Sequence, residues 1–352
     1  MRISTPWHFL GLVSFLLVVS VVAPAICKGQ QNSNEVQILK DSEAIFPVAE
    51  DLVLRGFSNS RRIIQPSTVT HAVVMIHGIL RNPERYYLPA TEVLKQKGLF
   101  AKVALIAIAF DNQDSAPRNM PRLAYFGPHW KHGDFGGKKA DDPQNRLSAF
   151  HAMDRVIEDL TKAYPRLKHI KVIGHSAGAQ FVDRYSIFSS VAGNLQQVHV
   201  QFVAMAPSMV LYPAELRPIV DKDARLTFGI PSDIANGEYN EYPYGLGPAT
   251  LLTQLVERFG SQRPKMVARV LQRDIVFAVG TEDTTSEWLD QSPSAKAQGP
   301  NRYMRLKYYA EFLKSHYYSK NHRFLPIFGV GHNSQKLIKS REMSKFFSDR
   351  EG

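Results

Sequence analysis

The sequence predicts an α/β fold in which a mostly parallel central sheet is covered by helices on both faces. Short runs of apolar, often β-branched residues alternate with longer segments of helical periodicity along most of the chain. Strands that are buried on both faces of a parallel sheet have this continuous apolar character. The chain of 352 residues contains no internal repeat or low-complexity linker, and its length suits one large domain with a sizeable core.

This alternation defines each expected element. The strands are expected at Ala72–Ile76, Val103–Phe110, Ile170–Ile173, Val198–Met205, Ile275–Val279 and Phe324–Phe328. The helices are expected at Glu84–Gln96, Leu147–Ala163, Ala177–Val191, Arg302–Ser315 and Ser334–Phe347. Right-handed crossovers between such strands place the strand carboxyl ends along one edge of the sheet, so a ligand site is expected at that edge.

Two long segments interrupt the alternation. Asp111–Arg146 is rich in Gly and Pro and contains Trp130, and Pro207–Arg273 is rich in Tyr, Pro and Gly and contains Tyr244. Loops of this length inside a compact domain are usually functional or disordered. We interpret the second segment, about 207–273, as a cap insertion over the active site. We expect Trp130 and Tyr244 to bind substrate, because aromatic side chains commonly line ligand pockets; the alternative is that both rings pack their segments onto the sheet.

The amino terminus has the three-part pattern of a secretory signal peptide. Met1–His8 carries one Arg and no acidic residue, Phe9–Val22 is mostly Leu, Val and Phe, and Ala23–Ala25 supplies small residues for cleavage. The apolar run is shorter than the roughly 20 residues of a membrane-spanning helix, which disfavours a membrane anchor. We therefore expect a signal peptide over residues 1–27, a catalytic domain over residues 28–352, and a secreted or periplasmic protein without a stable membrane span.

The cleavage site itself has two candidates, because small residues allow cleavage after Ala25 or after Cys27. Cys27 is the single cysteine, so the mature domain forms no internal disulfide and depends on its core for stability. Lipid anchoring at Cys27 is disfavoured because bulky Ile26 occupies a position that normally requires a small residue. The polar stretch Lys28–Glu35 is expected to form a flexible amino terminus.

The formal net charge of +11 raises the question of a nucleic-acid partner. The basic residues are scattered, and no expected helix or hairpin concentrates them beside stacking aromatics. We expect no nucleic-acid partner, although the charge favours anionic surfaces or polymers. The densest basic group is expected to form the solvated face of a terminal helix, and its members are Lys336, Lys339, Arg341 and Lys345.

The main chemical signal is the G-x-S-x-G motif of Gly174, Ser176 and Gly178, directly after an expected strand and before an expected helix. A sharp strand-to-helix turn exposes the serine hydroxyl and requires small neighbours. The positive end of the following helix stabilises negative charge that develops beside the hydroxyl. The motif alone is weak, but in this setting it predicts Ser176 as a nucleophile.

Two backbone N–H donors must face the oxyanion of an acyl-transfer transition state. One is expected from Ala177, the residue after the nucleophile, and the other from the loop that follows the strand Ala72–Ile76. Ile79 is the preferred donor of that loop, and Gly78 is the alternative. The side chain of His77 is expected to be a buried ring bonded to the backbone.

A serine nucleophile needs a histidine base and an acid that orients the histidine. Where the serine lies on a turn between a strand and a helix, these three residues follow the chain order Ser, Asp, His, so the acid is expected at the end of a later strand. Asp283 follows the strand Ile275–Val279 and is preferred, since a strand that turns at Gly280 commonly presents the residue three positions further on. The weaker candidates for the acid are Glu282, Asp274 and Asp290.

The base is expected at His332, which follows the last strand through two glycines that let the loop carry the ring into the site. His322 precedes that strand and would lie at the wrong end of the sheet. Metal chemistry is the competing use of His and Asp, but no H-x-x-x-H or H-E-x-x-H pair occurs on a plausible helix. We interpret His129 and His132, beside Asp134, as loop or pocket residues and expect no metal.

With these motifs, almost the whole mature chain resembles the α/β-hydrolase superfamily, and within it bacterial secreted esterases related to polyester depolymerases and feruloyl esterases. The resemblance implies hydrolysis through an acyl-serine intermediate, with no cofactor. Ala179 departs from the pattern, since relatives often carry a second glycine there. Besides the triad, the resemblance rests on His77-Gly78 with Arg81 and Asn82, Tyr86-Tyr87, Trp130-Lys131, Gly174–Gln180 with Arg184-Tyr185, Tyr242–Leu246, Ala297–Pro300 and Gly331-His332.

The favoured interpretation is a secreted serine hydrolase that cleaves carboxylic esters of small or polymeric substrates. A peptidase or amidase would use the same triad and is the alternative within enzymes. A non-catalytic binding protein on this fold is disfavoured by a complete Ser, Asp and His set in the expected order. Epoxide hydrolases and dehalogenases normally carry Asp at the elbow, so Ser176 disfavours both. No additional polymer-binding domain is recognised, which argues against action on crystalline polymer.

Overall fold

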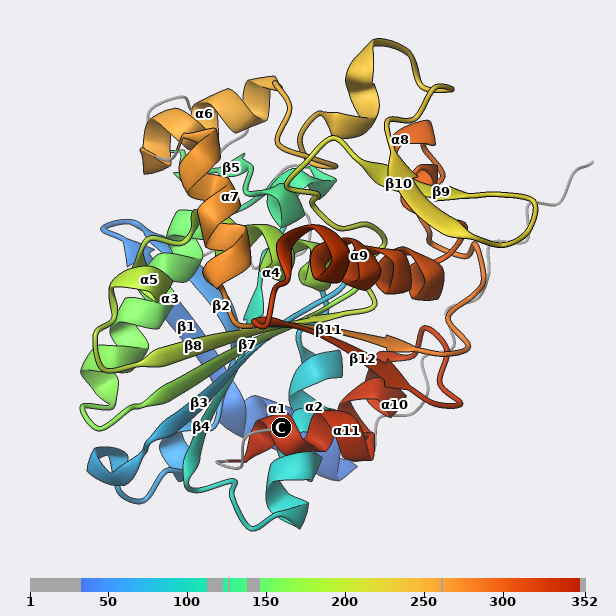
Figure 1. The fold of residues 1–352 in the computed structure, drawn as a ribbon. Coiled ribbons are helices and arrows are strands. Elements are labelled where there is room, and N and C mark those ends of the chain that lie inside the picture. Colours follow the sequence, from blue (N-terminus) through green and yellow to red (C-terminus); the bar gives the residue numbers. More distant parts are fainter. Residues whose placement is uncertain (1–32, 113–122, 126, 138–145, 261, 349–352) are drawn as a thin grey trace, which may run out of the picture.

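A computed structural model describes residues 33–112, 123–125, 127–137, 146–260 and 262–348 of the chain. The expected signal peptide over residues 1–27, with Cys27, lies outside the described residues. The described chain is built around an eight-stranded sheet with the order β1-β2-β4-β3-β7-β8-β11-β12 (Figure 1). The strands are β1 Glu43–Ala49, β2 Leu52–Ser58, β3 His71–Ile76, β4 Val103–Ala109, β7 His169–His175, β8 His199–Met205, β11 Ile275–Gly280 and β12 His322–Ile327.

The sheet is parallel from β4 to β12, as the sequence predicts, and each strand predicted from an apolar run is present in it. The central strands β3, β4, β7, β8 and β11 are buried along almost their whole length. Their pairing register aligns the strand ends, with Ile76 opposite Gly174 and His175 opposite Met205. The loops that follow β3, β7 and β11 therefore meet at one edge of the sheet.

Two antiparallel strands at the amino-terminal edge were not predicted. β1 pairs with β2 and β2 with β4, both antiparallel. Along β1 exposed and half-buried side chains alternate, so this strand lacks the continuous apolar run by which the others were recognised. The expected flexible stretch Lys28–Glu35 needs a correction, because its last residues belong to helix α1 Ser33–Ser42. Ile38 and Leu39 of α1 pack against the core, which holds the helix in place.

Helices cover both faces of the sheet (Figure 1). α1 and α2 Glu84–Gln96 lie on one face together with the carboxyl-terminal helices. The other face carries α3 Ala149–Ala163, α4 Ala177–Phe188, α5 Val191–Asn194 and α9 Arg302–Tyr317. The structure thus confirms the predicted mostly parallel sheet with helices on both faces.

The predicted terminal helix Ser334–Phe347 is divided into α10 Ser334–Lys339, α11 Arg341–Ser344 and the 3-10 turn η5 Lys345–Phe347. The break is at Ser340, whose backbone is extended and whose hydroxyl accepts the N–H of Met343 at 3.2 Å. Serine favours such a cap over a helix interior. The expected solvated face is confirmed, because its four basic residues are all exposed.

The segment 207–273 lies on the α4 and α9 side of the sheet (Figure 1). It contains the hairpin β9 Arg217–Val220 and β10 Leu226–Gly229, the 3-10 turn η4 Ala235–Asn240, and the helices α6 Thr250–Phe259 and α7 Arg263–Gln272. No helix within the described ranges is long and apolar enough to cross a membrane.

Candidate active site

Ser176 lies on a strained turn between β7 and α4, with φ 56° and ψ −112°. Its N–H donates to the carbonyl oxygen of Met205 at 2.9 Å, which joins the turn to the neighbouring strand. A Cβ atom at Gly174 would overlap the carbonyl oxygen of Gly178, and one at Gly178 would lie 2.5 Å from the carbonyl oxygens of Ile76 and His77. Both glycines of the motif are therefore required by close packing, and the strain at Ser176 is of the kind concentrated at active sites.

The loops after β11 and β12 are bonded to each other. Thr281 N–H donates to the carbonyl oxygen of Ile327 at 2.9 Å, and Glu282 N–H donates to that of Val330 at 3.0 Å. At Gly280 a Cβ atom would overlap the carbonyl oxygen of Val330, so only glycine allows this approach. The two loops thus hold their residues in a fixed relation.

The consequence is a short contact between the predicted base and the predicted acid. Nδ1 of His332 lies 2.7 Å from Oδ2 of Asp283, and the carboxylate is fully buried. A carboxylate only accepts, so Nδ1 must carry the proton and Nε2 is left as an acceptor. Glu282 is exposed at the surface. The structure therefore brings Asp283, and none of the weaker candidates, to His332.

Arg302, the first residue of α9, forms a buried ion pair with Asp283. Its Nη1 donates to Oδ1 of Asp283 at 3.2 Å, and both side chains are without exposed surface. Its Nη2 donates to the carbonyl oxygen of Glu287 at 3.0 Å. Burial lowers the pKa of Arg302, and the charge of Asp283 opposes that shift. Sequence reasoning missed Arg302, because a basic residue that opens a helix carries no pattern that marks it.

A cavity of about 260 Å³ joins the predicted nucleophile and base at the carboxyl edge of the sheet. Ser176 and His332 both line it. None of its described lining residues comes from the segment 207–273, whose role as a cap stays a prediction. The lining residues are Gly78, Ile79, Leu80, Asn82, Arg85, Tyr86, His175, Ser176, Thr285, Glu287, Trp288, His332, Asn333 and Ser334.

The two candidates for the second oxyanion donor differ in their present bonding. Gly78 N–H already donates to the hydroxyl of Tyr86 at 2.9 Å. Ile79 N–H forms no hydrogen bond with any described residue. Ala177 opens α4, so its N–H has no preceding helical turn to bond. The free N–H of Ile79 favours it over Gly78.

Tyr86 and His175 form a neutral wall of the cavity that the sequence did not reveal. The hydroxyl of Tyr86 lies 3.2 Å from Nδ1 of His175, and the His175 ring centroid lies 4.6 Å from that of His332. Burial raises the pKa of Tyr86 to about 12. Burial, reinforced by the charge of His332, lowers the pKa of His175 well below its usual range. The phenol therefore stays protonated and the imidazole stays neutral beside the predicted base.

His77 is a buried ring bonded to the backbone, as predicted. Its Nδ1 lies 2.7 Å from the carbonyl oxygen of Gly78, and its Nε2 accepts the N–H of Phe110 at 2.8 Å. Burial lowers the pKa of His77 to about 3, so the ring is neutral. It fixes the backbone between β3 and the loop of Ile79.

Trp130 and Tyr244 do not line the cavity of Ser176. Trp130 has no exposed surface and stacks on Phe110 with ring centroids 5.0 Å apart. The Tyr244 hydroxyl lies 3.2 Å from Oδ2 of Asp290 and 3.0 Å from Oγ of Ser292. Trp130 therefore matches the alternative in which the ring packs its segment onto the core, whereas Tyr244 bonds to the loop that precedes α8 Pro293–Lys296. A substrate-binding role for either residue stays a prediction.

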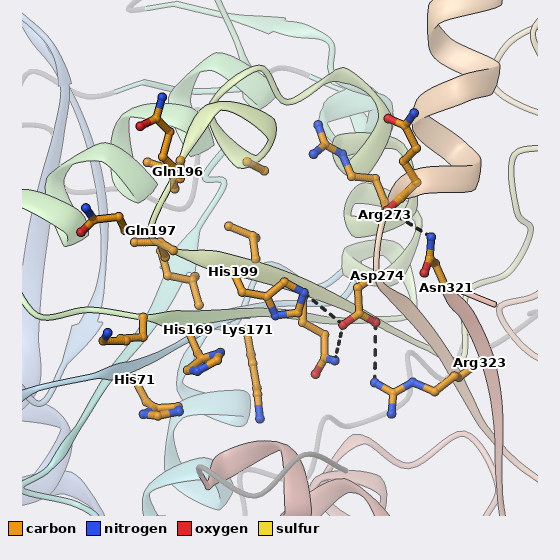
Figure 2. A pocket seen from close by; sticks show the side chains of 18 of the residues that line it. His71, His169, Lys171, Gln196, Gln197, His199, Arg273, Asp274, Asn321 and Arg323 are labelled. Atoms are coloured by element: carbon orange, nitrogen blue, oxygen red, sulfur yellow. Dashed lines mark hydrogen bonds and ion pairs between the residues drawn. The ribbon is translucent and has the colours of Figure 1, made fainter. Parts of the chain in front are cut away.

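A second, larger cavity of about 840 Å³ lies at the opposite edge, where the strands begin (Figure 2). His71, His169 and His199 line it in register across β3, β7 and β8. Asp274 lies there as well, with Oδ2 3.4 Å from Nε2 of His199, which removes it as a candidate for the orienting acid. No described residue of this cavity carries a hydroxyl or thiol, so it contains no nucleophile for acyl transfer.

His129 and His132, the weighed metal ligands, lie with ring centroids 5.7 Å apart. Burial lowers the pKa of His132 well below its usual range. The carboxylate of Asp134 accepts the N–H of Phe135 at 2.7 Å. No group of three or more His, Cys, Asp or Glu suited to a metal ion occurs among the described residues.

Solved structures with the same arrangement identify the fold. A poly(3-hydroxybutyrate) depolymerase from Bordetella parapertussis aligns over 90% of this chain and 92% of its own, with 18% identity and a TM-score of 0.59. A poly(aspartic acid) hydrolase from Sphingomonas sp. KT-1 aligns over 84% of this chain and 94% of its own, with 16% identity and a TM-score of 0.56. No family model matches the chain, and no curated protein matches its sequence. The chain therefore has the α/β-hydrolase fold.

Proposed function

We propose that the protein is a serine hydrolase that cleaves carboxylic esters through an acyl-serine intermediate. Ser176 is the nucleophile, His332 the general base and Asp283 the acid that orients His332. The observation that carries the proposal is the 2.7 Å contact of His332 with buried Asp283 beside a cavity that also contains Ser176 on its strained turn. Nucleophile, base and orienting acid in one place are the requirement for this chemistry.

The reaction begins when Oγ of Ser176 attacks the ester carbonyl carbon and its proton passes to Nε2 of His332. Asp283 stabilises the imidazolium that forms, without taking the proton itself. The tetrahedral intermediate then collapses, the C–O bond to the alcohol breaks, and His332 protonates the leaving oxygen. Water repeats the sequence on the acyl-serine and releases the acid. No redox step or cofactor enters this balance.

The oxyanion of the tetrahedral intermediate is proposed to accept the backbone N–H groups of Ile79 and Ala177. The unbonded N–H of Ile79 and the position of Ala177 at the start of α4 support this assignment. Donors fixed before the reaction need no reorganisation when charge develops, and one such donor contributes about 3 kcal/mol to catalysis. The positive end of α4 adds to the same stabilisation.

Small and polymeric esters are the proposed substrates. Two proteins of this fold are a poly(3-hydroxybutyrate) depolymerase and a poly(aspartic acid) hydrolase. The first polymer is a polyester, which supports ester substrates, and the second is a polyamide, which keeps the amidase alternative open. The test is a panel of aryl esters of varied acyl length, each paired with the corresponding anilide. Hydrolysis of the esters at the higher kcat/KM supports the esterase, and a preference for the anilides would instead make the protein an amidase.

Export is proposed from the sequence pattern at residues 1–27. Expression of the full chain should place the mature protein outside the cytoplasm, with an amino terminus that begins after Ala25 or after Cys27. Mass spectrometry of the exported protein locates the cut. An uncleaved chain that stays in the membrane fraction would contradict this part of the proposal.

A further inference from the structure

Arg85 is a charged residue of the cavity that the proposed reaction does not use. It lies in the first turn of α2, is exposed, and lines the same cavity as Ser176 and His332. Its guanidinium forms no hydrogen bond or ion pair with any described residue. Many other arginines of the chain are bonded, for example Arg81, which donates to three backbone carbonyl oxygens. Arg85 therefore offers its full set of donors to the cavity.

The charge of Arg85 acts on the cavity wall. It opposes the rise that burial causes in the pKa of Tyr86, and it adds to the lowering that burial causes in the pKa of His175. Exposed charges act within about 10 Å at ordinary ionic strength, and Arg85 lines the same cavity as Ser176. A substrate held for attack by Ser176 would thus lie within the field of Arg85.

One acidic side chain, Glu287, lines the cavity among its described residues. No ion pair joins Glu287 to Arg85. Instead, Oε1 of Glu287 accepts the indole N–H of Trp288 at 3.1 Å. The side chains of Asn82, Thr285, Asn333 and Ser334 in the lining carry no charge. Among the described lining residues, Arg85 is thus the one Lys or Arg that can meet an anionic group.

We propose that Arg85 binds a carboxylate carried by the substrate, so that the cavity selects esters that bear a negative charge. This inference rests on the proposed function and names its substrate class. A guanidinium presents parallel N–H donors that match the two oxygens of a carboxylate. The net charge of +11 would draw such substrates toward the protein before they bind.

The test compares matched acidic and neutral esters, so that each pair differs mainly in charge. One pair places the carboxylate in the leaving group, as para-acetoxybenzoate against para-methylphenyl acetate. The other places it in the acyl group, as monomethyl adipate against methyl hexanoate. The measured quantity is the ratio of kcat/KM for the acidic ester to that for the neutral ester, which cancels general losses of activity.

Arg85→Gln should lower this ratio about two- to fivefold in at least one pair, the upper part of the range for a single ion pair at an exposed position. Arg85→Lys should keep part of the ratio, because the charge remains while the fork geometry is lost. Glu287→Gln should raise the ratio, since it removes the opposing charge. Added salt should lower the wild-type ratio toward that of Arg85→Gln.

The matched control is Arg166→Gln, which removes an exposed and unpaired arginine outside both cavities and should leave both ratios unchanged. Equal ratios for wild type and Arg85→Gln in both pairs, with ester hydrolysis intact, would overturn this inference alone. Absence of hydrolysis for all four esters would contradict the proposed function itself.

Discussion

Among the described residues, two arginine–aspartate pairs are buried, and their differences separate a proposed catalytic arrangement from a structural one. Arg302 and Asp283 lie 3.2 Å apart at the cavity edge, and Arg184 and Asp183 lie 3.6 Å apart beneath the segment 207–273. All four side chains are almost completely buried. Burial and ion pairing are thus the same in both places.

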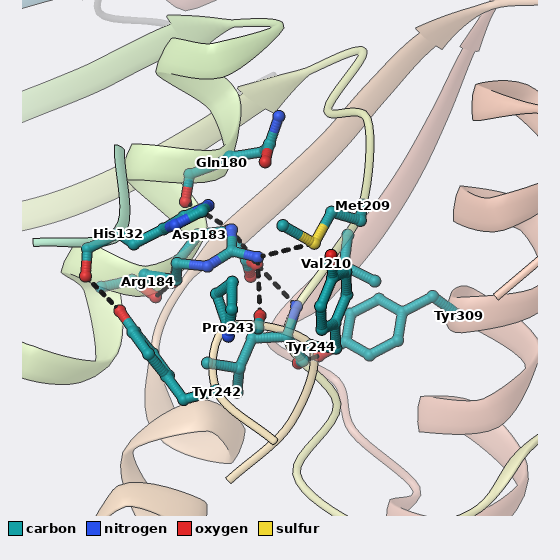
Figure 3. Close-up of polar contacts among 12 residues, drawn as sticks. His132, Gln180, Asp183, Arg184, Met209, Val210, Tyr242, Pro243, Tyr244 and Tyr309 are labelled. Carbon is teal, nitrogen blue, oxygen red and sulfur yellow. Dashed lines mark hydrogen bonds and ion pairs between the residues drawn. The ribbon is translucent and has the colours of Figure 1, made fainter. Parts of the chain in front are cut away.

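The other partners of the two carboxylates differ. Oδ2 of Asp283, the oxygen that does not bond Arg302, faces the ring of His332, which lines the cavity. Oδ2 of Asp183, the oxygen that faces Arg184, accepts the backbone N–H of Leu211 at 2.8 Å (Figure 3). A buried, perturbed carboxylate alone therefore does not identify a catalytic residue, and the group it orients decides its role.

Arg184 serves the architecture in the same way. It donates to the carbonyl oxygen of Gln180 and to that of Pro243, each at 2.8 Å, and the hydroxyl of Tyr242 donates to the carbonyl oxygen of His132 (Figure 3). These bonds join α4, the segment 207–273 and the loop of His132. The Asp183–Arg184 pair thus holds backbone segments in place, whereas the Asp283–Arg302 pair holds His332, the proposed base.

The largest effect is expected from the groups that react. Ser176→Ala and His332→Ala should each remove nearly all ester hydrolysis, and the double variant should lose no more than either single variant. Residues of a triad act as a unit, with losses of up to about 10⁶-fold in kcat. Initial rates on an aryl ester measure this, with the melting temperature as the control for folding. Additive losses in the double variant would contradict a shared step.

Asp283→Asn should lower kcat by about 10⁴-fold, because the amide no longer holds His332 in the required tautomer. The variant keeps the side-chain volume but leaves buried Arg302 without its charge partner, so a lower melting temperature is expected and kcat is measured well below it. The matched variant is Asp183→Asn, which changes an equally buried carboxylate and should leave kcat/KM within about twofold. Similar losses in the two variants would erase the distinction between the pairs.

Arg302→Gln tests whether the arginine positions Asp283. Removing one partner of a buried ion pair costs about 3–5 kcal/mol in unfolding free energy, because the other charge is left without compensation. We expect lower stability and a lower kcat, with KM little changed, since Arg302 does not line the cavity. Stability loss with an unchanged kcat well below the melting temperature would assign Arg302 a purely structural role.

The smallest effect on activity, and a specific effect on stability, is expected at Asp183. Burial raises its pKa from the usual 3.8 to about 6, so the folded state binds the proton more tightly than the unfolded state. The corresponding stabilisation is complete below pH 4 and is lost as the pH rises through about 6. Relative to Asp183→Asn, the free energy of unfolding of the wild type should fall by on the order of 3 kcal/mol across this pH range. A constant difference in unfolding free energy between the wild type and Asp183→Asn from pH 4 to 7, measured by chemical denaturation, would contradict the raised pKa.

The sequence predicted the parallel core because its strands are continuous apolar runs. It missed β1, where exposed and half-buried residues alternate, and β2, where buried and half-buried residues alternate along the first half of the strand. At the site it indicated the Ser176 turn from two glycines, and contacts at Gly174 and Gly178 show why those glycines are needed. It could not reveal Arg302, which meets Asp283 only through the packing of α9 onto the sheet.

Aromatic residues in the long segments gave the least reliable prediction of substrate-binding residues. Trp130 and Tyr244 were expected at the substrate, yet Trp130 packs in the core and Tyr244 bonds to Asp290 and Ser292. Composition cannot separate a ring that lines a cavity from one that anchors an insertion, because both environments are apolar with a polar edge. The contacts of the described residues favour packing for Trp130, and the role of Tyr244 stays a prediction.

The most direct test of the central claim is mass spectrometry of the protein after reaction with a fluorophosphonate. The account predicts one adduct, on the hydroxyl of Ser176, which is absent in Ser176→Ala. It also predicts slow labelling in His332→Ala and in Asp283→Asn, and labelling at the wild-type rate in Asp183→Asn. An adduct on another serine, or hydrolysis of esters that persists in Ser176→Ala, would contradict the account.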